Sequence, residues 1–148
     1  MADKRIFVGS SSAAKTQAKL LIKGLARQGI EFLPWWDAFT AGRTLLHELD
    51  RIRASVDAAL ILFSPDIPAT LRDKTVAMPN QNVLFEFGYF YGCLGSDKVA
   101  IVKYSDFYLP SDLGGYIHIY GSGWFKANHG TPASAQTKKE FERWLKNI

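Results

Sequence analysis

The sequence predicts an α/β fold in which a doubly wound, five-stranded parallel sheet is flanked by helices. Short apolar runs alternate with amphipathic helical patterns along the 148 residues, as in strands that are joined by crossover helices. The run Ala58–Phe63 is almost continuously apolar, which is typical of a strand buried on both faces of a parallel sheet. From its length we expect the chain to form one domain over residues 1–148.

The remaining elements are expected from periodicity and from turn residues. Short apolar runs indicate further strands at residues 5–8, 30–33, 98–103 and 116–120. Apolar residues spaced three and four apart indicate helices at 13–27, 44–55 and 136–146, and a further helix around Glu86 that begins after Pro79. The connections 34–42 and 64–78 contain proline, with glycine in the first, and are expected to be loops.

The composition excludes several classes of function. Hydrophobic residues make up 47% and charged residues 22% of the chain, as in soluble globular proteins. The net charge of +4 favours anionic partners such as the phosphates of a dinucleotide, but no basic stripe interleaved with aromatics indicates nucleic acid. The three histidines are far apart and Cys93 is the only cysteine, so we expect no metal site and a buried Cys93. No signal peptide or membrane-spanning segment is indicated, which favours a cytoplasmic protein.

Glu86 is the most informative residue, because no other charged residue lies between Lys74 and Asp97. A carboxylate in an apolar element loses hydration and must regain it from partners or from a substrate. Glu86 is therefore either a functional group or a structural one. In a structural role it would accept hydrogen bonds from free backbone N–H groups at the start of the helix, or pair with a basic side chain. Asn82 lies one turn earlier on the same helical face, where it can orient Glu86.

Three segments are expected to meet at the carboxyl ends of the strands, where ligands bind in open α/β sheets. They are the loop after the first strand, the loop 34–42 and the start of the Glu86 helix. The first loop contains Gly9, Ser10 and Ser11, small residues whose backbone amides can approach phosphate groups. A serine cap of the following helix is an equally good interpretation of this loop.

The second loop carries aromatic residues and one carboxylate. Trp35 and Phe39 can stack on a ring of the ligand, or pack against the next helix instead. Asp37 can contact a ribose hydroxyl, or cap the helix that follows. The residues alone leave both pairs of alternatives open.

Five segments in this order resemble the bacterial TIR-like family, whose members have been labelled predicted nucleotide-binding proteins. They are KRIFVGSSS at 4–12, PWWDAFTAGRTLL at 34–46, SPD at 64–66, NVLFEFGYFYGCL at 82–94 and LPSDLGG at 109–115. The resemblance covers essentially the whole chain. Its most specific part is the pattern NVxFExGxFxGxLG, which runs here from Asn82 to Gly95.

The resemblance implies a flavodoxin-like TIR fold and hydrolysis of NAD⁺ to nicotinamide and an ADP-ribose product, linear or cyclic. The glutamate of the NVxFE motif is the catalytic residue of the family, which implies this role for Glu86. NAD⁺ is then a substrate, and no cofactor is expected. Members often serve as effector domains in antiphage defence, fused to a STING-like or SAVED sensor of cyclic nucleotides and activated by assembly into oligomers or filaments.

The chain departs from the family pattern in two ways. No segment corresponds to a sensor domain, and Asn80 stands where many members have an arginine two places before the motif asparagine. Two other functions remain open. A nucleoside deoxyribosyltransferase-like enzyme uses a glutamate nucleophile on an N-glycosidic bond, and a non-enzymatic TIR-type scaffold only self-associates.

Overall fold

The computed structural model describes residues 3–104, 113, 116, 118–121 and 132–148. Its main sheet has five parallel strands in the order β2-β1-β3-β6-β7. The strands are β1 (Lys4–Gly9), β2 (Ile30–Pro34), β3 (Ala58–Phe63), β6 (Val99–Lys103) and β7 (His118–Tyr120). The strand order reverses between β1 and β3, as in flavodoxin-like folds, where ligands bind near this switch point. The expected doubly wound α/β fold is thereby confirmed.

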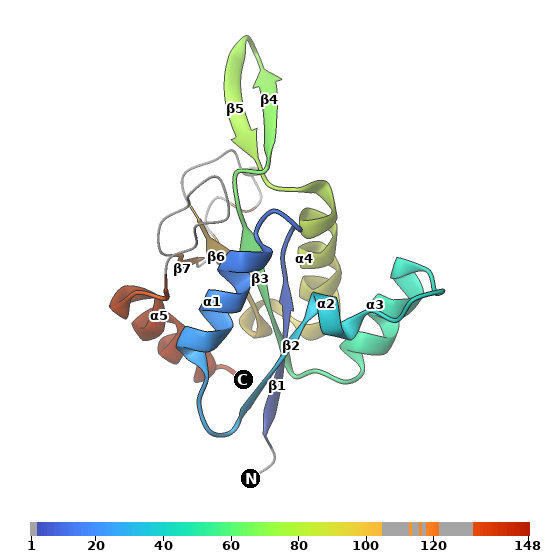
Figure 1. The fold of residues 1–148 in the computed structure, drawn as a ribbon, viewed down its shortest axis with the longest axis vertical. Coiled ribbons are helices and arrows are strands. Elements are labelled where there is room, and N and C mark those ends of the chain that lie inside the picture. The colour runs from blue at the N-terminus through green and yellow to red at the C-terminus, as the bar shows by residue number, and fades with distance from the viewer. Residues whose placement is uncertain (1–2, 105–112, 114–115, 117, 122–131) are drawn as a thin grey trace.

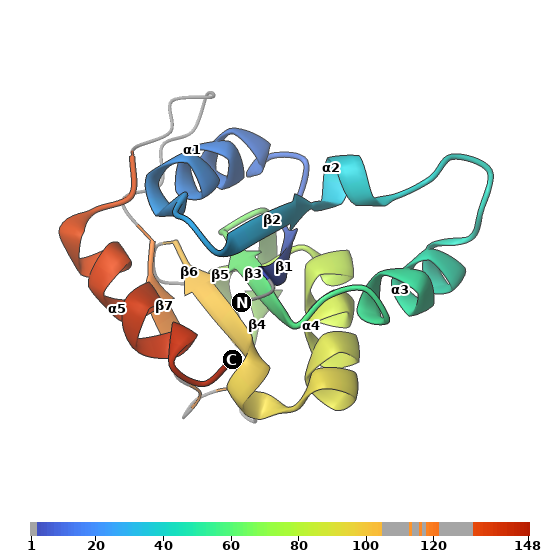
Figure 2. The same cartoon turned by 90° about the horizontal axis from the view of Figure 1, so that it is seen from below.

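Helices cover both faces of the sheet (Figures 1 and 2). On one face lie α1 (Lys15–Leu25) and α5 (Ala135–Leu145), and on the other lie α3 (Leu45–Arg53) and α4 (Gln81–Leu94). Two short elements complete the described part, the helix α2 (Trp35–Ala38) and the 3₁₀ turn η1 (Ser96–Lys98). The layers follow from the crossover connections, which place helices on both faces of a parallel sheet.

The central strand β3 separates two apolar cores. All six of its residues are buried. Leu60 and Leu62 pack in the core beneath α1 and α5, whereas Ile61 and Phe63 pack in the core beneath α3 and α4. Because successive side chains of a strand point to opposite faces, a strand between two helical layers must be apolar throughout.

The segments expected as loops contain secondary structure. The connection 34–42 begins with the helical turn α2, and residues 64–78 include an antiparallel hairpin of β4 (Ile67–Leu71) and β5 (Lys74–Met78). In Figure 1 the hairpin projects beyond the end of the sheet at which α4 begins. Its turn is formed by Arg72 and Asp73 with φ of 46° and 65°. Without the glycine that usually marks such turns, the sequence carried no clear hairpin signal.

The outer face of α4 also differs from expectation. Cys93 is exposed, because the helix turns Val83, Phe87 and Phe90 towards the core instead. Gly88 and Gly92 are exposed on α4. A methyl group on either glycine would have no described atom within 4 Å.

The ends of several elements are shifted by one or two residues. The strand expected at 116–120 is seen at His118–Tyr120, and the last helix starts one residue early. The LPSDLGG segment lies outside the described residues apart from Leu113. Within the described part, no helix combines the length and the apolarity that a membrane crossing requires.

Candidate functional site

The register of α4 turns Glu86 towards the sheet. Asn80 caps the helix, and its side-chain oxygen accepts the backbone N–H of Asn82 at 2.8 Å. Val83 and Phe87, one on each side of Glu86, are buried in the core, so the same helical face carries the glutamate inwards. Glu86 is only 6% exposed.

The carboxylate of Glu86 occupies the space above Gly9 at the carboxyl end of β1. A methyl group on Gly9 would lie 2.9 Å from Glu86 Oε2 and 3.0 Å from Ile61 Cδ1. Any side chain larger than hydrogen at position 9 would therefore displace the carboxylate. Because β1 adjoins β3 at the reversal of strand order, Glu86 and Gly9 lie where ligands bind in this class of sheet.

No described residue compensates the charge of Glu86. Its Oε2 is buried without a hydrogen-bond partner, and no ion pair to a described residue involves it. Burial raises the pKa of Glu86 from its ordinary value of 4.5 to about 7. At the start of α4 the free backbone N–H of Asn82 is bound by Asn80 and not by Glu86. The described residues thus contain neither of the two partners that a purely structural role would require.

Glu48 shows how this chain treats a buried glutamate with a structural role. It lies on α3 and is 1% exposed. Arg51 donates to its Oε2 from Nε at 2.8 Å. Its Oε1 accepts no hydrogen bond from a described residue, but it forms an ion pair with Arg43 Nε at 3.8 Å. The contrast between a paired Glu48 and an unpaired Glu86 points to a ligand as the missing partner of Glu86.

Two of the predicted segments are joined by a hydrogen bond. The indole Nε1 of Trp35 donates to the hydroxyl of Ser10 at 2.8 Å, which ties α2 to the loop after β1. The Ser11 hydroxyl accepts the backbone N–H of Ala14 at 3.2 Å, in the turn before α1. The N-cap of α1 is Ala14, which makes no side-chain cap bond, so no serine caps this helix. Ser10 in turn donates to the Ser11 carbonyl. Both hydroxyls therefore have protein partners.

Phe39 and Asp37, the other two predicted residues of the second loop, have different surroundings. Phe39 packs edge-on against Phe7, with ring centroids 6.2 Å apart, and Phe7 lies beside the space above Gly9. Asp37 is exposed, and its side chain makes no hydrogen bond or ion pair with a described residue. It does not cap the next helix, because Thr44 does so by accepting the N–H of His47.

Asn82 and Asn80 differ from what the motif suggested. Asn82 is exposed, and no hydrogen bond joins its side chain to Glu86 in the structure. Asn80, at the place of the arginine that many family members have, is engaged as the helix cap. It therefore does not replace that arginine as a charged partner of the site.

Sequence reasoning missed two cations at this end of the sheet. Lys15 and Lys19 lie one turn apart on α1, and their ammonium groups lie over the ring of Trp36. Lys15 also lies over the ring of Trp35. A spacing of four residues on the helix that follows the serine loop was the available signal.

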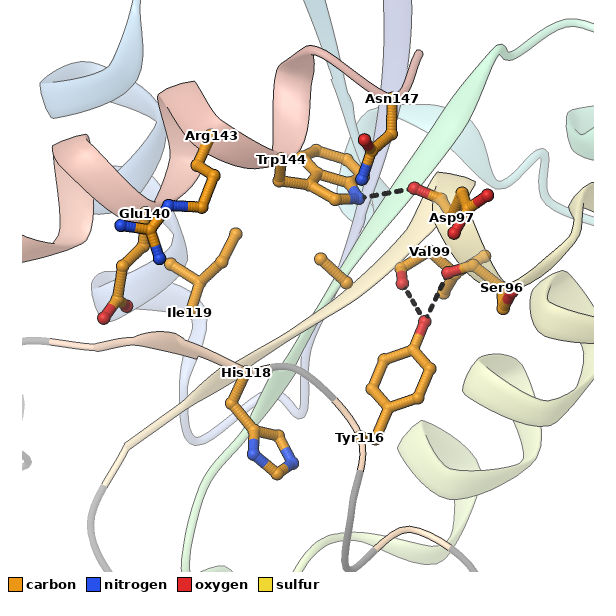
Figure 3. Close-up of a pocket in the computed structure, with 11 residues that line it drawn as sticks. Ser96, Asp97, Val99, Tyr116, His118, Ile119, Glu140, Arg143, Trp144 and Asn147 are labelled. Atoms are coloured by element: carbon orange, nitrogen blue, oxygen red, sulfur yellow. Dashed lines mark hydrogen bonds between the residues drawn. The ribbon is translucent and has the colours of Figure 1, made fainter.

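A separate cavity lies at the edge of the sheet formed by β6 and β7 (Figure 3). It measures about 490 Å³ and is bordered by Ser96, Asp97, Val99, Ala100, Tyr116, His118, Ile119, Glu140, Arg143, Trp144 and Asn147. Two bonds drawn in Figure 3 fix its walls, from Tyr116 to the Ser96 carbonyl at 2.7 Å and from Trp144 to the Asp97 carbonyl at 2.9 Å. None of the predicted site residues borders it. No cluster of three potential metal ligands occurs among the described residues.

Comparison with known proteins shows the family of the chain. A family model described as "CAP12/Pycsar effector protein, TIR domain" matches residues 5–122 of the chain. The chain belongs to this family of TIR domains. The matched region includes the serine loop, the two tryptophans and the whole of α4, and so contains every residue of the predicted site of this TIR domain.

Curated relatives are longer than this TIR domain. The chain is 34% identical to "CD-NTase-associated protein 12" of Sphingobacterium faecium over 112 residues, covering 76% of the chain and 34% of that protein. It is 30% identical to "Pycsar effector protein XpPycTIR" of Xanthomonas perforans over 141 residues, covering 91% of the chain and 46% of that protein. It is 29% identical to "Pycsar effector protein PaPycTIR" of Pseudomonas aeruginosa over 113 residues, covering 74% of the chain and 37% of that protein. The chain thus spans between a third and a half of these relatives.

Proposed function

We propose that this TIR domain cleaves NAD⁺ with Glu86 as the catalytic residue, releasing nicotinamide and either ADP-ribose, by hydrolysis, or its cyclic form, by ring closure in place of the addition of water. The observation that carries the proposal is the Glu86 carboxylate, which is buried, unpaired and placed over Gly9 at the switch point of the sheet. A carboxylate in such a place is suited to a cationic ligand, since an opposite charge stabilises its ionised form.

The chemistry requires only one carboxylate. The nicotinamide ring of NAD⁺ carries a positive charge, so breaking the bond between its nitrogen and ribose C1′ releases neutral nicotinamide without a general acid. Positive charge then builds on the ribose, and Glu86 stabilises it in a site of low dielectric constant. Water adds to C1′ and loses a proton, which gives ADP-ribose. Two carboxylates, as in most glycosidases, are not needed.

The remaining predicted residues surround Glu86 in this proposal. The backbone at Gly9, Ser10 and Ser11 faces the phosphates, and Trp35 or Phe39 lies against a ring of the substrate. Support comes from the Trp35–Ser10 hydrogen bond and from the contact of Phe7 with Phe39. Both place an aromatic side chain next to the loop that follows β1.

The test is nicotinamide release by the wild type and by Glu86→Gln. Both proteins are concentrated on lipid vesicles through a terminal tag, so that assembly is enforced. Glu31→Gln, which changes an exposed carboxylate on β2, is the control. We expect release from the wild type and the control and a fall of at least about 100-fold in Glu86→Gln. Assembly without any NAD⁺ turnover would favour the scaffold function, and transfer between added nucleosides would favour the transferase.

We further propose that the domain is an antiphage effector that assembly activates. The relatives are named as CD-NTase-associated and Pycsar effector proteins, and the chain spans less than half of their length. A cyclic-nucleotide sensor is therefore the expected partner. The outer face of α4 supports self-association, since it exposes Phe85 and Tyr91 beside Gly88 and Gly92.

A further inference from the structure

Two lysines are held over two tryptophan rings beside the site. Lys15 Nζ lies 5.6 Å from the ring centroid of Trp35 and 5.3 Å from that of Trp36. Lys19 Nζ lies 5.9 Å from the centroid of Trp36. At these distances the ring faces attract the ammonium groups. Two flexible cations are thereby gathered at one place.

This cationic cluster is connected to Glu86 by a short series of contacts. Trp35 donates to Ser10 at 2.8 Å, Ser10 adjoins Gly9 in sequence, and Gly9 lies under the Glu86 carboxylate. Trp36 packs with the core under α1 and α5, whereas Glu86 belongs to α4 on the opposite face. The series therefore crosses the carboxyl end of the sheet from one helical layer to the other.

The charges of the two lysines are not neutralised by the described residues. No ion pair or hydrogen bond of either ammonium group occurs within that part of the chain. Arg5, Arg27 and Arg51, by contrast, each pair with a glutamate. Two like charges that share one aromatic ring repel each other, so a bound anion would relieve the repulsion. Lys15 also begins α1, where the helix dipole favours an anion.

We propose that Lys15 and Lys19 bind the diphosphate of the dinucleotide whose nicotinamide ribose lies at Glu86. The inference rests on the proposed function for the identity of the ligand. This assignment orients the bound substrate. The nicotinamide ribose lies under α4, and the phosphates lie beside the first turns of α1. The assignment also supplies the cationic partner that Asn80, engaged as a helix cap, does not provide.

The kinetic test compares Lys15→Gln/Lys19→Gln with the wild type. Lys23→Gln is the matched control, because Lys23 is an exposed lysine of the same helix that does not lie over a tryptophan ring. We expect KM for NAD⁺ to rise about 10- to 100-fold in the double variant, with kcat changed much less, as two charge-assisted contacts are lost. Lys23→Gln should behave as the wild type. An unchanged KM in the double variant would overturn the assignment.

A binding test separates this inference from the proposed function. ADP-ribose, which has two phosphates, and adenosine, which has none, are titrated into the wild type and the double variant by calorimetry. We expect weaker binding of ADP-ribose alone in the double variant. Equal binding of ADP-ribose by both proteins would show that the lysines only hold the tryptophans. A wild type that binds ADP-ribose through the lysines without cleaving NAD⁺ would overturn the proposed function and keep the phosphate site.

Discussion

The carboxylate of Glu86 lies where the side chain of residue 9 would be, and Gly9 leaves that space open. The separation between Glu86 Oε2 and a methyl group on residue 9 would be 2.9 Å, closer than such groups approach in proteins. The end of β1 and the second turn of α4 are therefore fitted to each other. The activity and the stability of the domain should both depend on this contact.

Replacing Gly9 with alanine should damage the site more than the fold. The added methyl group meets Glu86 Oε2 at 2.9 Å and Ile61 Cδ1 at 3.0 Å, so the carboxylate must move. We expect NAD⁺ turnover to fall at least about 10-fold and stability to fall by about 1–3 kcal/mol, as for other overpacked sites. Nicotinamide release and urea denaturation measure the two effects.

A double-mutant cycle tests whether the loss of turnover acts through Glu86. Adding Gly9→Ala to Glu86→Gln should reduce the residual turnover far less than Gly9→Ala reduces that of the wild type. Independent, multiplicative losses would show that Gly9 affects turnover by another route.

The stability of the wild type should depend on pH through Glu86. The folded state raises the pKa of this group from 4.5 to about 7, so it holds the proton more tightly than the unfolded state does. The contribution is complete below pH 4.5 and is lost as pH rises towards 7. The wild type should therefore lose about 3 kcal/mol of unfolding free energy through this group between pH 4.5 and 8, whereas Glu86→Gln, which has no carboxyl group there, should not.

Glu48→Gln is the matched variant for this experiment. Glu48 is also buried, but it is paired with Arg51 and Arg43. Its replacement should destabilise the protein at neutral pH by about 1–3 kcal/mol, since partners lose their acceptor. Parallel stability curves for wild type and Glu86→Gln over this pH range would refute a desolvated Glu86.

The rate of hydrolysis should rise with pH. The proposed mechanism needs the ionised carboxylate, and burial raises the pKa of Glu86 in the free protein to about 7. The value of kcat/KM, which reports the free enzyme, should rise about tenfold per pH unit below 7 and level off above it. The apparent pKa of Glu86 in the pH profile of kcat should be lower, because the bound cationic substrate favours the ionised form of Glu86. A flat profile of kcat/KM from pH 5 to 8 would contradict the assignment.

Asn80 should act on stability and not on substrate binding. Its side chain accepts the N–H of Asn82 at the start of α4, so Asn80→Ala should cost about 1 kcal/mol and leave KM for NAD⁺ close to the wild-type value. Asn80→Ser, which keeps a capping oxygen, should restore stability. A raised KM at unchanged stability would show that Asn80 contacts the substrate instead.

Replacing Gly88 with alanine should have opposite effects on the stability of the monomer and on its assembly. A methyl group there meets no described atom within 4 Å, so Gly88→Ala should stabilise the isolated domain by about 0.5–1 kcal/mol. If the outer face of α4 is a contact between copies, the same change should weaken assembly. Light scattering and thermal unfolding distinguish the two effects, and stabilisation with unchanged assembly would remove this face from the proposal.

The order and type of the main elements could be predicted because each is encoded locally. The continuous apolar run of β3 and the periodic stripes of α1, α3 and α5 are visible within single segments of the sequence. The hairpin β4–β5 was missed because its turn uses Arg72 and Asp73 rather than glycine. The exposure of Cys93 depended on the helical register of α4, which a mostly apolar sequence does not specify.

The candidate site could be predicted only in part. Glu86 could be predicted because it is the only carboxylate in an apolar run. Gly9 and Trp35 could be placed near it because the carboxyl ends of parallel strands meet at one edge of the sheet. The Trp35–Ser10 bond and the engagement of Asn80 as a cap depend on side-chain geometry. Lys15 and Lys19 were overlooked because nothing in the sequence near them shows that two tryptophans lie alongside.

Patterns of neighbouring residues were enough to predict the parallel α/β architecture and to single out Glu86, since periodicity and an isolated charge are local properties. That Glu86 lacks a partner among the described residues and that Glu48 has one is visible only in the folded chain. The physical reason is that desolvation and pairing depend on contacts between residues that are distant along the chain. Gly9 and Glu86 meet only because β1 and α4 are packed on the same sheet.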